Sequence, residues 1–276
     1  MKENRYVLDF KIQYSISIPA YDNIILTLVF LQRKSDIRKV MSMISWWSES
    51  APFIQIFGGH HFIYISIIVF LLILLLRKKE KVKKHRKRIA AVVLTIFILQ
   101  QILLYGWYIF ETGFDISESL PLHISRITSL FGIYFLITKN LRVLDIIFFF
   151  GLFAYASFLY PQRVYPIYHV IGLSFLINHA ITLLLPYFAY IAYDWRPKFS
   201  GLKKAYAAFL VYFTFVYFLN PMIDGNYFYL KHRPFLQHWP DYLYVPGTLI
   251  VVFSGFLLAY FVARLISKWT EKQRLS

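Results

Sequence analysis

The chain alternates long apolar stretches with short polar breaks seven times between residues 61 and 266. Most of these stretches approach the roughly 20 residues that a helix needs to cross a bilayer. A lipid-exposed backbone must satisfy its own hydrogen bonds, so each crossing segment should be helical. The pattern predicts an all-α polytopic membrane protein with seven transmembrane helices. The expected spans are residues 61–76, 89–110, 121–138, 141–160, 167–193, 205–220 and 243–266.

Basic residues fall mainly in every second break. The break at residues 77–88 holds nine lysines and arginines, and further basic residues follow the third, fifth and seventh spans. The break at residues 111–120 holds acidic residues and no basic ones. Because cytoplasmic loops are enriched in Lys and Arg, this asymmetry predicts a cytoplasmic C-terminus and an N-terminus outside.

Residues 1–40 do not follow this pattern, because they add seven basic residues on the side where the rest of the chain avoids them. We expect them to be an N-terminal extension or a mis-called start, with the biological start at Met41 or Met43. Residues 41–276 would then form a single seven-helix membrane domain. In the alternative interpretation the segment is interfacial, with Trp46 and Trp47 at the outer headgroups.

Composition supports the membrane assignment and narrows the chemistry. The chain is 58% hydrophobic with a mean hydropathy of +0.53. Its formal charge of +16 would suggest a nucleic-acid partner in a soluble protein, but here the charge lies between spans. We therefore expect membrane lipids, and no nucleic acid, as partners; protein partners are unknown. The absence of cysteine excludes disulfides and thiolate chemistry, and no histidine pair has metal-site spacing, so neither a metal nor a cofactor is expected.

Ionisable groups inside spans are costly and mark candidate sites. Pro121 suits the first turn of the third span. In a regular helix His123 and Arg126 would share a face, whereas Ser125 would point about 200° away. Ser125 as nucleophile would need a base from another helix. Otherwise His123 would act directly as general base while Arg126 binds a phosphate or oxyanion; the structural alternative has both residues reaching lipid headgroups.

Further candidates lie in the fifth span and at the outer ends of the helices. His179 would face the bundle interior, either as a functional residue or joined to a neighbouring helix through Asn178. Gln100 and Gln101 are expected to make similar interhelical contacts, and Asp145 to pair with Arg142. Pro221 is expected to end the sixth span. The candidate substrate contacts are Arg126, Arg163, His169, Asn178, Asn226 and Tyr227.

Three motifs together resemble the YwaF family of bacterial multispanning membrane proteins: Leu120-Pro121-Leu122-His123, Asn178-His179, and Asn220 with the segment 226–230. The resemblance covers residues 50–270. The YwaF family is related to animal transmembrane protein 164, a membrane acyltransferase that moves fatty acyl chains between phospholipids. This relation implies that His123 and His179 are catalytic. The animal branch has a cysteine next to the first histidine, where this chain has Leu122, so Ser125 or direct transfer would replace a cysteine acyl-enzyme.

We therefore expect an integral acyltransferase of the bacterial plasma membrane that acts on phospholipids or lysophospholipids from the outer half of the bilayer. Two other functions remain open, a lipid or small-molecule transporter or flippase and a non-catalytic envelope scaffold. The chain shows no inverted repeat of the kind that many transporters contain.

Overall fold

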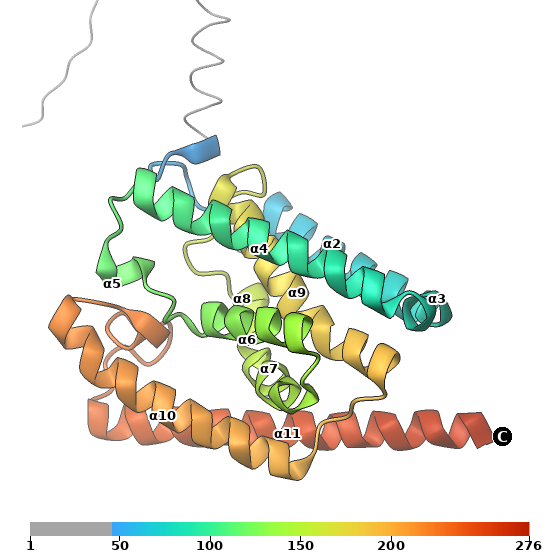
Figure 1. Cartoon of the computed structure of the whole chain (residues 1–276). Coiled ribbons are helices and arrows are strands. Elements are labelled where there is room, and N and C mark those ends of the chain that lie inside the picture. The colour runs from blue at the N-terminus through green and yellow to red at the C-terminus, as the bar shows by residue number, and fades with distance from the viewer. Residues whose placement is uncertain (1–45, 276) are drawn as a thin grey trace, which may run out of the picture. The chain divides into compact units, whose positions relative to one another are not determined.

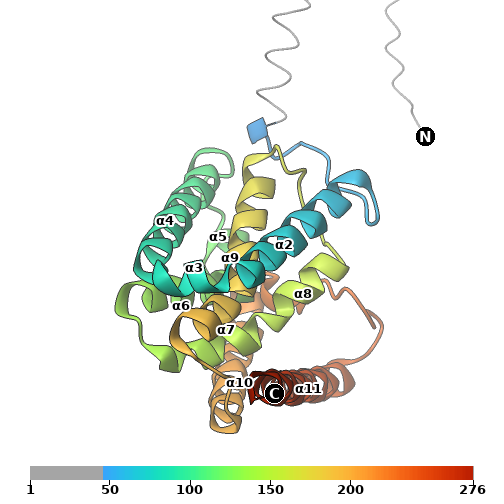
Figure 2. The ribbon, with the colours of Figure 1, turned by 90° about the vertical axis from the view of Figure 1, so that its right-hand side faces the viewer.

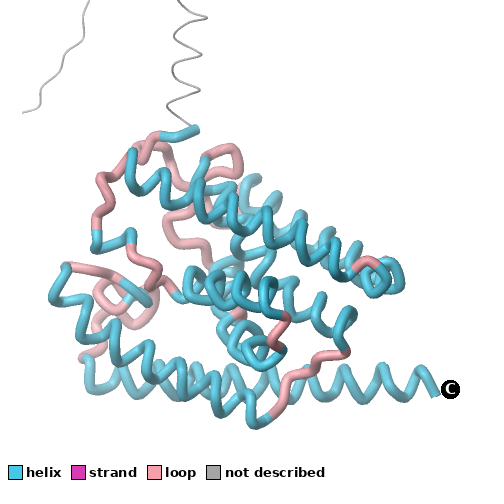
Figure 3. The backbone as a smooth tube through the Cα atoms, in the orientation of Figure 1, coloured by secondary structure: helices cyan, strands magenta, loops and turns pink. Residues whose placement is uncertain are grey.

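The computed structural model describes residues 46–275, with side chains up to residue 268. The predictions of an extension over residues 1–40 and of a start at Met41 or Met43 therefore lie outside the described residues. Within the described part, every regular element is a helix, and short loops join the helices (Figure 3). This confirms the predicted all-α class.

Figure 1 shows the helices, and the long ones follow the apolar stretches of the sequence. Within residues 46–275, six segments are long and apolar enough to cross a membrane: Gly59–Arg77, Arg86–Phe110, Leu141–Leu159, Val170–Tyr193, Phe199–Ile223 and Asp241–Lys268. In chain order the elements are α2 (Gly59–Arg77), α3 (Lys79–Lys84), α4 (Arg86–Phe110), α5 (Ile116–Ser119), α6 (Ile124–Thr138), η1 (Leu141–Val143), α7 (Leu144–Phe150), α8 (Leu152–Leu159), α9 (Val170–Tyr193), α10 (Phe199–Ile223), η2 (Tyr227–Tyr229) and α11 (Asp241–Leu275).

α6 is shorter than the predicted third span. Its 15 residues extend about 22 Å, against about 30 Å for the hydrocarbon core of a bilayer. The helix starts late because Leu120 and His123 have extended backbones, with ψ of 151° and 135°. It stops early because Lys139 adopts a left-handed φ of 58°. Seven membrane spans are therefore not confirmed, and the prediction that Pro121 opens this helix is wrong.

α9 lies at the centre of the bundle (Figure 2) and contacts α2, α3, α4, α6, α7 and α8. Small residues along it let neighbouring segments approach closely. A Cβ on Gly172, for example, would lie 2.0 Å from the carbonyl oxygen of Pro166. The amide of Gln100 donates to the Ser174 hydroxyl at 2.6 Å, which confirms the predicted interhelical role of Gln100. α9 is thus the element on which the other helices are positioned.

The contacts of the Asp145 carboxylate differ from those predicted. Among the described residues no ion pair joins it to Arg142. The carboxylate instead lies near the backbone amide of Lys198, directly before α10, and its Oδ1 atom has no hydrogen-bond partner among the described residues. It packs so closely on Gly201 that an added Cβ there would lie 2.2 Å from the Asp145 Cγ atom. The carboxylate therefore joins α7 to the positive N-terminal end of α10.

α10 also runs further than expected. Pro221 lies inside it, and the helix ends where Asp224 adopts a left-handed φ of 54°. The prediction that Pro221 ends the sixth span is therefore wrong by about one turn.

The two ends of the bundle carry different charge. At one end Lys83 of α3 lies 3.9 Å from Asp194, and Arg86 lies over the ring of Tyr193. The basic C-terminal helix α11 points toward this same end (Figure 1). The opposite end is formed by residues 46–57, α5 and η2, where Trp107 donates to the Trp47 carbonyl at 2.5 Å. The basic breaks thus share one end, as the alternation predicts, and the orientation in a membrane stays a prediction.

Candidate functional site

Arg126 forms the centre of a polar cluster at the end of the bundle opposite α3. Its Nη1 donates to the carbonyl oxygens of Glu118 at 2.6 Å and Leu120 at 2.9 Å, and its Nη2 donates to the Tyr108 hydroxyl. Arg126 as a whole is 8% exposed, and its guanidinium lies over the Tyr108 ring. No described carboxylate forms an ion pair with it. A buried cation held only by neutral oxygens retains a strong attraction for an anion.

Tyr227 fixes the segment that Arg126 holds. Its hydroxyl donates to the carbonyl of Ile116 at 2.7 Å and accepts from the amide of Leu120 at 3.0 Å. In a regular α-helix the Leu120 amide would donate directly to the Ile116 carbonyl, four residues earlier. Here the Tyr227 hydroxyl stands between these two groups and bridges them, so it is inserted into the last turn of α5. Burial raises the pKa of Tyr227 to about 12, so the hydroxyl keeps its proton at neutral pH. Asn220 in turn holds the Tyr227 backbone through two hydrogen bonds of 2.9 and 3.0 Å.

His123 follows this fixed segment and caps the N-terminus of α6. Its carbonyl accepts from the amides of Arg126 and Ile127, at 2.8 and 3.1 Å. Its half-buried imidazole lies 5.0 Å from the Tyr227 ring and 6.5 Å from the Tyr229 ring, measured between centroids. The ring makes no hydrogen bond to any described residue. Burial, aided by the Arg126 charge, lowers its pKa well below the ordinary value, so the imidazole is neutral and has a free acceptor nitrogen.

Two buried hydroxyls near Arg126 have no hydrogen-bond partner among the described residues, those of Ser119 and Tyr105. Ser119 lies between the two carbonyl groups that Arg126 binds. Tyr105 precedes Tyr108 by one turn of α4, and their rings lie 6.5 Å apart. Buried polar groups are nearly always bonded, so these exceptions call for an explanation, and a bound polar group would supply one.

Four residues of this region were not predicted from the sequence: Tyr105, Tyr108, Ser119 and Tyr212. Tyr212 donates to the Leu122 carbonyl at 2.8 Å and so holds the residue before His123. The spacing of Tyr105 and Tyr108, three residues apart, places both on one helix face and was the available signal. That signal is weak in a chain with 22 tyrosines.

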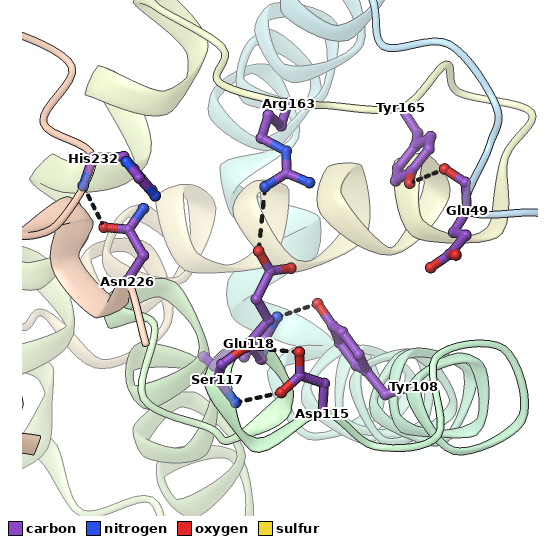
Figure 4. Close-up of polar contacts among 10 residues, drawn as sticks. Glu49, Tyr108, Asp115, Ser117, Glu118, Arg163, Tyr165, Asn226 and His232 are labelled. Atoms are coloured by element: carbon purple, nitrogen blue, oxygen red, sulfur yellow. Dashed lines mark hydrogen bonds and ion pairs between the residues drawn. The ribbon is translucent and has the colours of Figure 1, made fainter. Parts of the chain in front are cut away.

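Three of the candidate substrate contacts have local structural partners. Arg163 lies 3.3 Å from Glu118 in an exposed ion pair (Figure 4). The amide oxygen of Asn226 accepts from the backbone amide of His232 (Figure 4) and from that of Lys231, both at 3.0 Å. His169 caps α9 with its Nδ1 atom, and its Nε2 donates to the Ser48 carbonyl at 3.1 Å. Burial lowers the pKa of His169, and this bonding pattern needs the neutral imidazole.

His179 and Asn178 lie on different sides of α9. The Asn178 side chain accepts a hydrogen bond from Ser129 of α6, which confirms its interhelical contact. The Nδ1 atom of His179 donates to the Phe175 carbonyl at 2.8 Å, and the imidazole packs against Phe158 and Phe175. These rings are not among the neighbours of His123. The described contacts therefore do not bring the two histidines together.

Ser125 lies in the first turn of α6. Its carbonyl accepts from the Ser129 hydroxyl at 2.8 Å, and its own hydroxyl forms no hydrogen bond to a described imidazole. The prediction that His123 and Ser125 do not form a dyad within one helix agrees with this arrangement. The shared helix face expected for His123 and Arg126 is wrong in detail, because His123 precedes the helix.

Among the described residues no group of three or more histidine and acidic side chains is arranged to hold a metal ion. The polar cluster consists instead of a cation, a neutral imidazole and several hydroxyls. Such a set suits an anionic or ester-containing ligand.

Comparison with known proteins places the chain in a family. No curated protein and no solved structure matches it. A model of the TMEM164 family matches residues 56–263, a stretch that contains His123, Arg126 and Tyr227. This match covers well over half of the sequence, so the chain belongs to the TMEM164 family and is a multi-pass membrane protein.

Proposed function

We propose that the chain is an acyltransferase that moves a fatty acyl group between phospholipids in a bacterial plasma membrane, with its site in the outer half of the bilayer. The observation that carries the proposal is the unbonded neutral imidazole of His123 beside the buried guanidinium of Arg126. Family membership and the resemblance of three short motifs to YwaF proteins add support.

Acyl transfer requires a base and a stabiliser of negative charge. In the proposed step, His123 removes the proton from a lysophospholipid hydroxyl as its oxygen attacks the ester carbonyl carbon of a second phospholipid. The resulting oxyanion lies near Arg126, which retains N–H groups beyond the three hydrogen bonds described above. The C–O bond to the donor glycerol then breaks, and His123 returns the proton to the departing alkoxide. Every atom is conserved, and no external cofactor takes part.

Direct transfer is favoured over a covalent acyl-enzyme. The chain has no cysteine, and Leu122 stands beside His123. Ser125 has no imidazole within a described hydrogen bond to activate it. His179 stays the second catalytic candidate by resemblance, and the proposed step assigns it no proton transfer, because its described contacts are with Phe158 and Phe175 and not with His123.

Purified protein in vesicles supplies the test, with a phosphatidylcholine donor labelled in one acyl chain and an unlabelled lysophospholipid acceptor. Replacing His123 by Ala should lower the transfer rate by at least about 100-fold, the usual contribution of a general base. His238→Ala is the matched control, because that exposed loop histidine lies outside the cluster. Equal rates for the native chain and His123→Ala, with folding intact, would refute the proposed mechanism.

A further inference from the structure

The basic segment between α2 and α4 has a defined structure. α3 occupies residues 79–84, between turns at Lys78 and His85. Val82 is 6% exposed and packs into the same core cluster as Ala90 and Phe97. Figure 2 shows α3 lying across the ends of α2 and α4. The segment is therefore anchored, and its basic side chains project from a fixed support.

Part of this segment lines an open surface hollow of about 600 Å³. Five basic residues line it together with His85, and Glu80 is the only acidic lining residue. Lys83 has a partner in Asp194 at 3.9 Å, and Arg86 lies over the Tyr193 ring. No described carboxylate pairs with the remaining basic lining residues, which are Lys84, Lys87 and Arg88.

The position of the hollow identifies the available ligand. α2 and α4 are consecutive candidate spans, so the segment between them lies where two spans leave the bilayer. Phospholipid headgroups surround such a position, and anionic headgroups attract clustered Lys and Arg side chains.

We propose that this hollow binds the headgroup of an anionic phospholipid through Lys84, Lys87 and Arg88. The site is independent of the proposed acyl-transfer chemistry. Arg86 and Tyr108 stand at opposite ends of α4, about 33 Å apart along the helix. Failure of one proposal therefore leaves the other intact.

The test compares two variants of equal charge. The hollow variant carries Lys84→Gln, Lys87→Gln and Arg88→Gln. The control variant carries Lys78→Gln, Lys79→Gln and Lys81→Gln in the same segment, at exposed positions outside the lining. The full chain in detergent is titrated with phosphatidylglycerol or phosphatidylcholine of identical acyl chains, and bound lipid is counted by native mass spectrometry.

We expect the native chain to prefer phosphatidylglycerol. One basic residue near an anionic lipid contributes about fivefold to binding. The hollow variant should therefore lose at least about tenfold in phosphatidylglycerol affinity, and the control variant less than about threefold. The single variant Lys87→Gln, with an expected loss of about fivefold, covers the case in which the triple variant does not fold.

Three results would overturn the proposal. Equal losses in the two triple variants would indicate general charge attraction rather than a site. Equal affinity of the native chain for the two lipids would exclude headgroup selection. Displacement of phosphatidylglycerol by an equimolar amount of inorganic phosphate would assign the site to free phosphate instead of a lipid.

Discussion

The placement of His123 depends on a single atom, the hydroxyl oxygen of Tyr227. Tyr227→Phe removes that atom and keeps the ring, which is fully buried. The Ile116 carbonyl and the Leu120 amide then both lose their partner. They recover one bond only by closing directly on each other, which requires Leu120 to move toward Ile116. The segment that leads to His123 should shift accordingly.

The expected cost follows from the two lost bonds. A typical hydrogen bond contributes about 1 kcal/mol net, and a buried group left unpaired costs about 1–3 kcal/mol. Partial recovery through the direct bond places the expected loss near 2 kcal/mol. For a protein of this size that loss corresponds to a decrease in Tm of about 5 °C.

Thermal unfolding in detergent and hydrogen exchange over residues 112–123 measure the two effects. Tyr229→Phe is the matched control, because its ring also faces His123 but its hydroxyl makes no hydrogen bond to a described residue. Tyr227→Phe should lower the Tm, speed exchange in this segment and reduce transfer activity, while Tyr229→Phe should do none of these. If the two variants behave alike, the inserted hydroxyl does not hold the segment.

Three further predictions rest on other contacts. Gly201→Ala should destabilise by about 1–3 kcal/mol in thermal unfolding, because its Cβ would displace Asp145, whereas Gly106→Ala has open space and should be neutral. The pKa of His169 is lowered in the folded protein, so the stability that depends on its neutral imidazole should be complete above about pH 6.5 and decrease as the pH falls below that value. His169→Asn replaces it with a cap that does not titrate and should flatten the dependence of Tm on pH. An unchanged profile of Tm against pH in this variant would contradict the prediction. His179→Ala should lower transfer activity if the resemblance to YwaF proteins extends to mechanism, and full activity would limit the catalytic assignment to His123.

The hydropathy pattern predicted most of the fold, because a helix that crosses a bilayer must be a long apolar stretch of sequence. The two ends of the bundle could be distinguished for the same reason, since most Lys and Arg residues of the breaks lie at one end. The errors occurred where local backbone geometry decides. His123 and Lys139 limit α6 through an extended and a left-handed backbone, and Pro221 is accommodated inside α10. Neither feature changes the hydropathy pattern.

The candidate site was predicted only in part. His123 and Arg126 were selected because ionisable groups near apolar segments are rare and costly. The partners of Arg126 could not be foreseen, since two of them are backbone carbonyl groups, which every residue possesses. Asp145 shows the same limit: its sequence neighbour Arg142 suggested an ion pair, but its contacts lie more than 50 residues away, at Lys198 and Gly201.

The short helix α6 has a consequence for how a lipid reaches His123. If the Lys139 end of α6 lies at one boundary of the hydrocarbon core, its 15 residues carry His123 to a depth about 8 Å below the other boundary. The proposed catalytic base would then stand about 8 Å beneath the layer of glycerol esters. A phospholipid would need to sink by about half of the hydrocarbon thickness of one leaflet for its acyl bond to react, and its chains would never have to enter water.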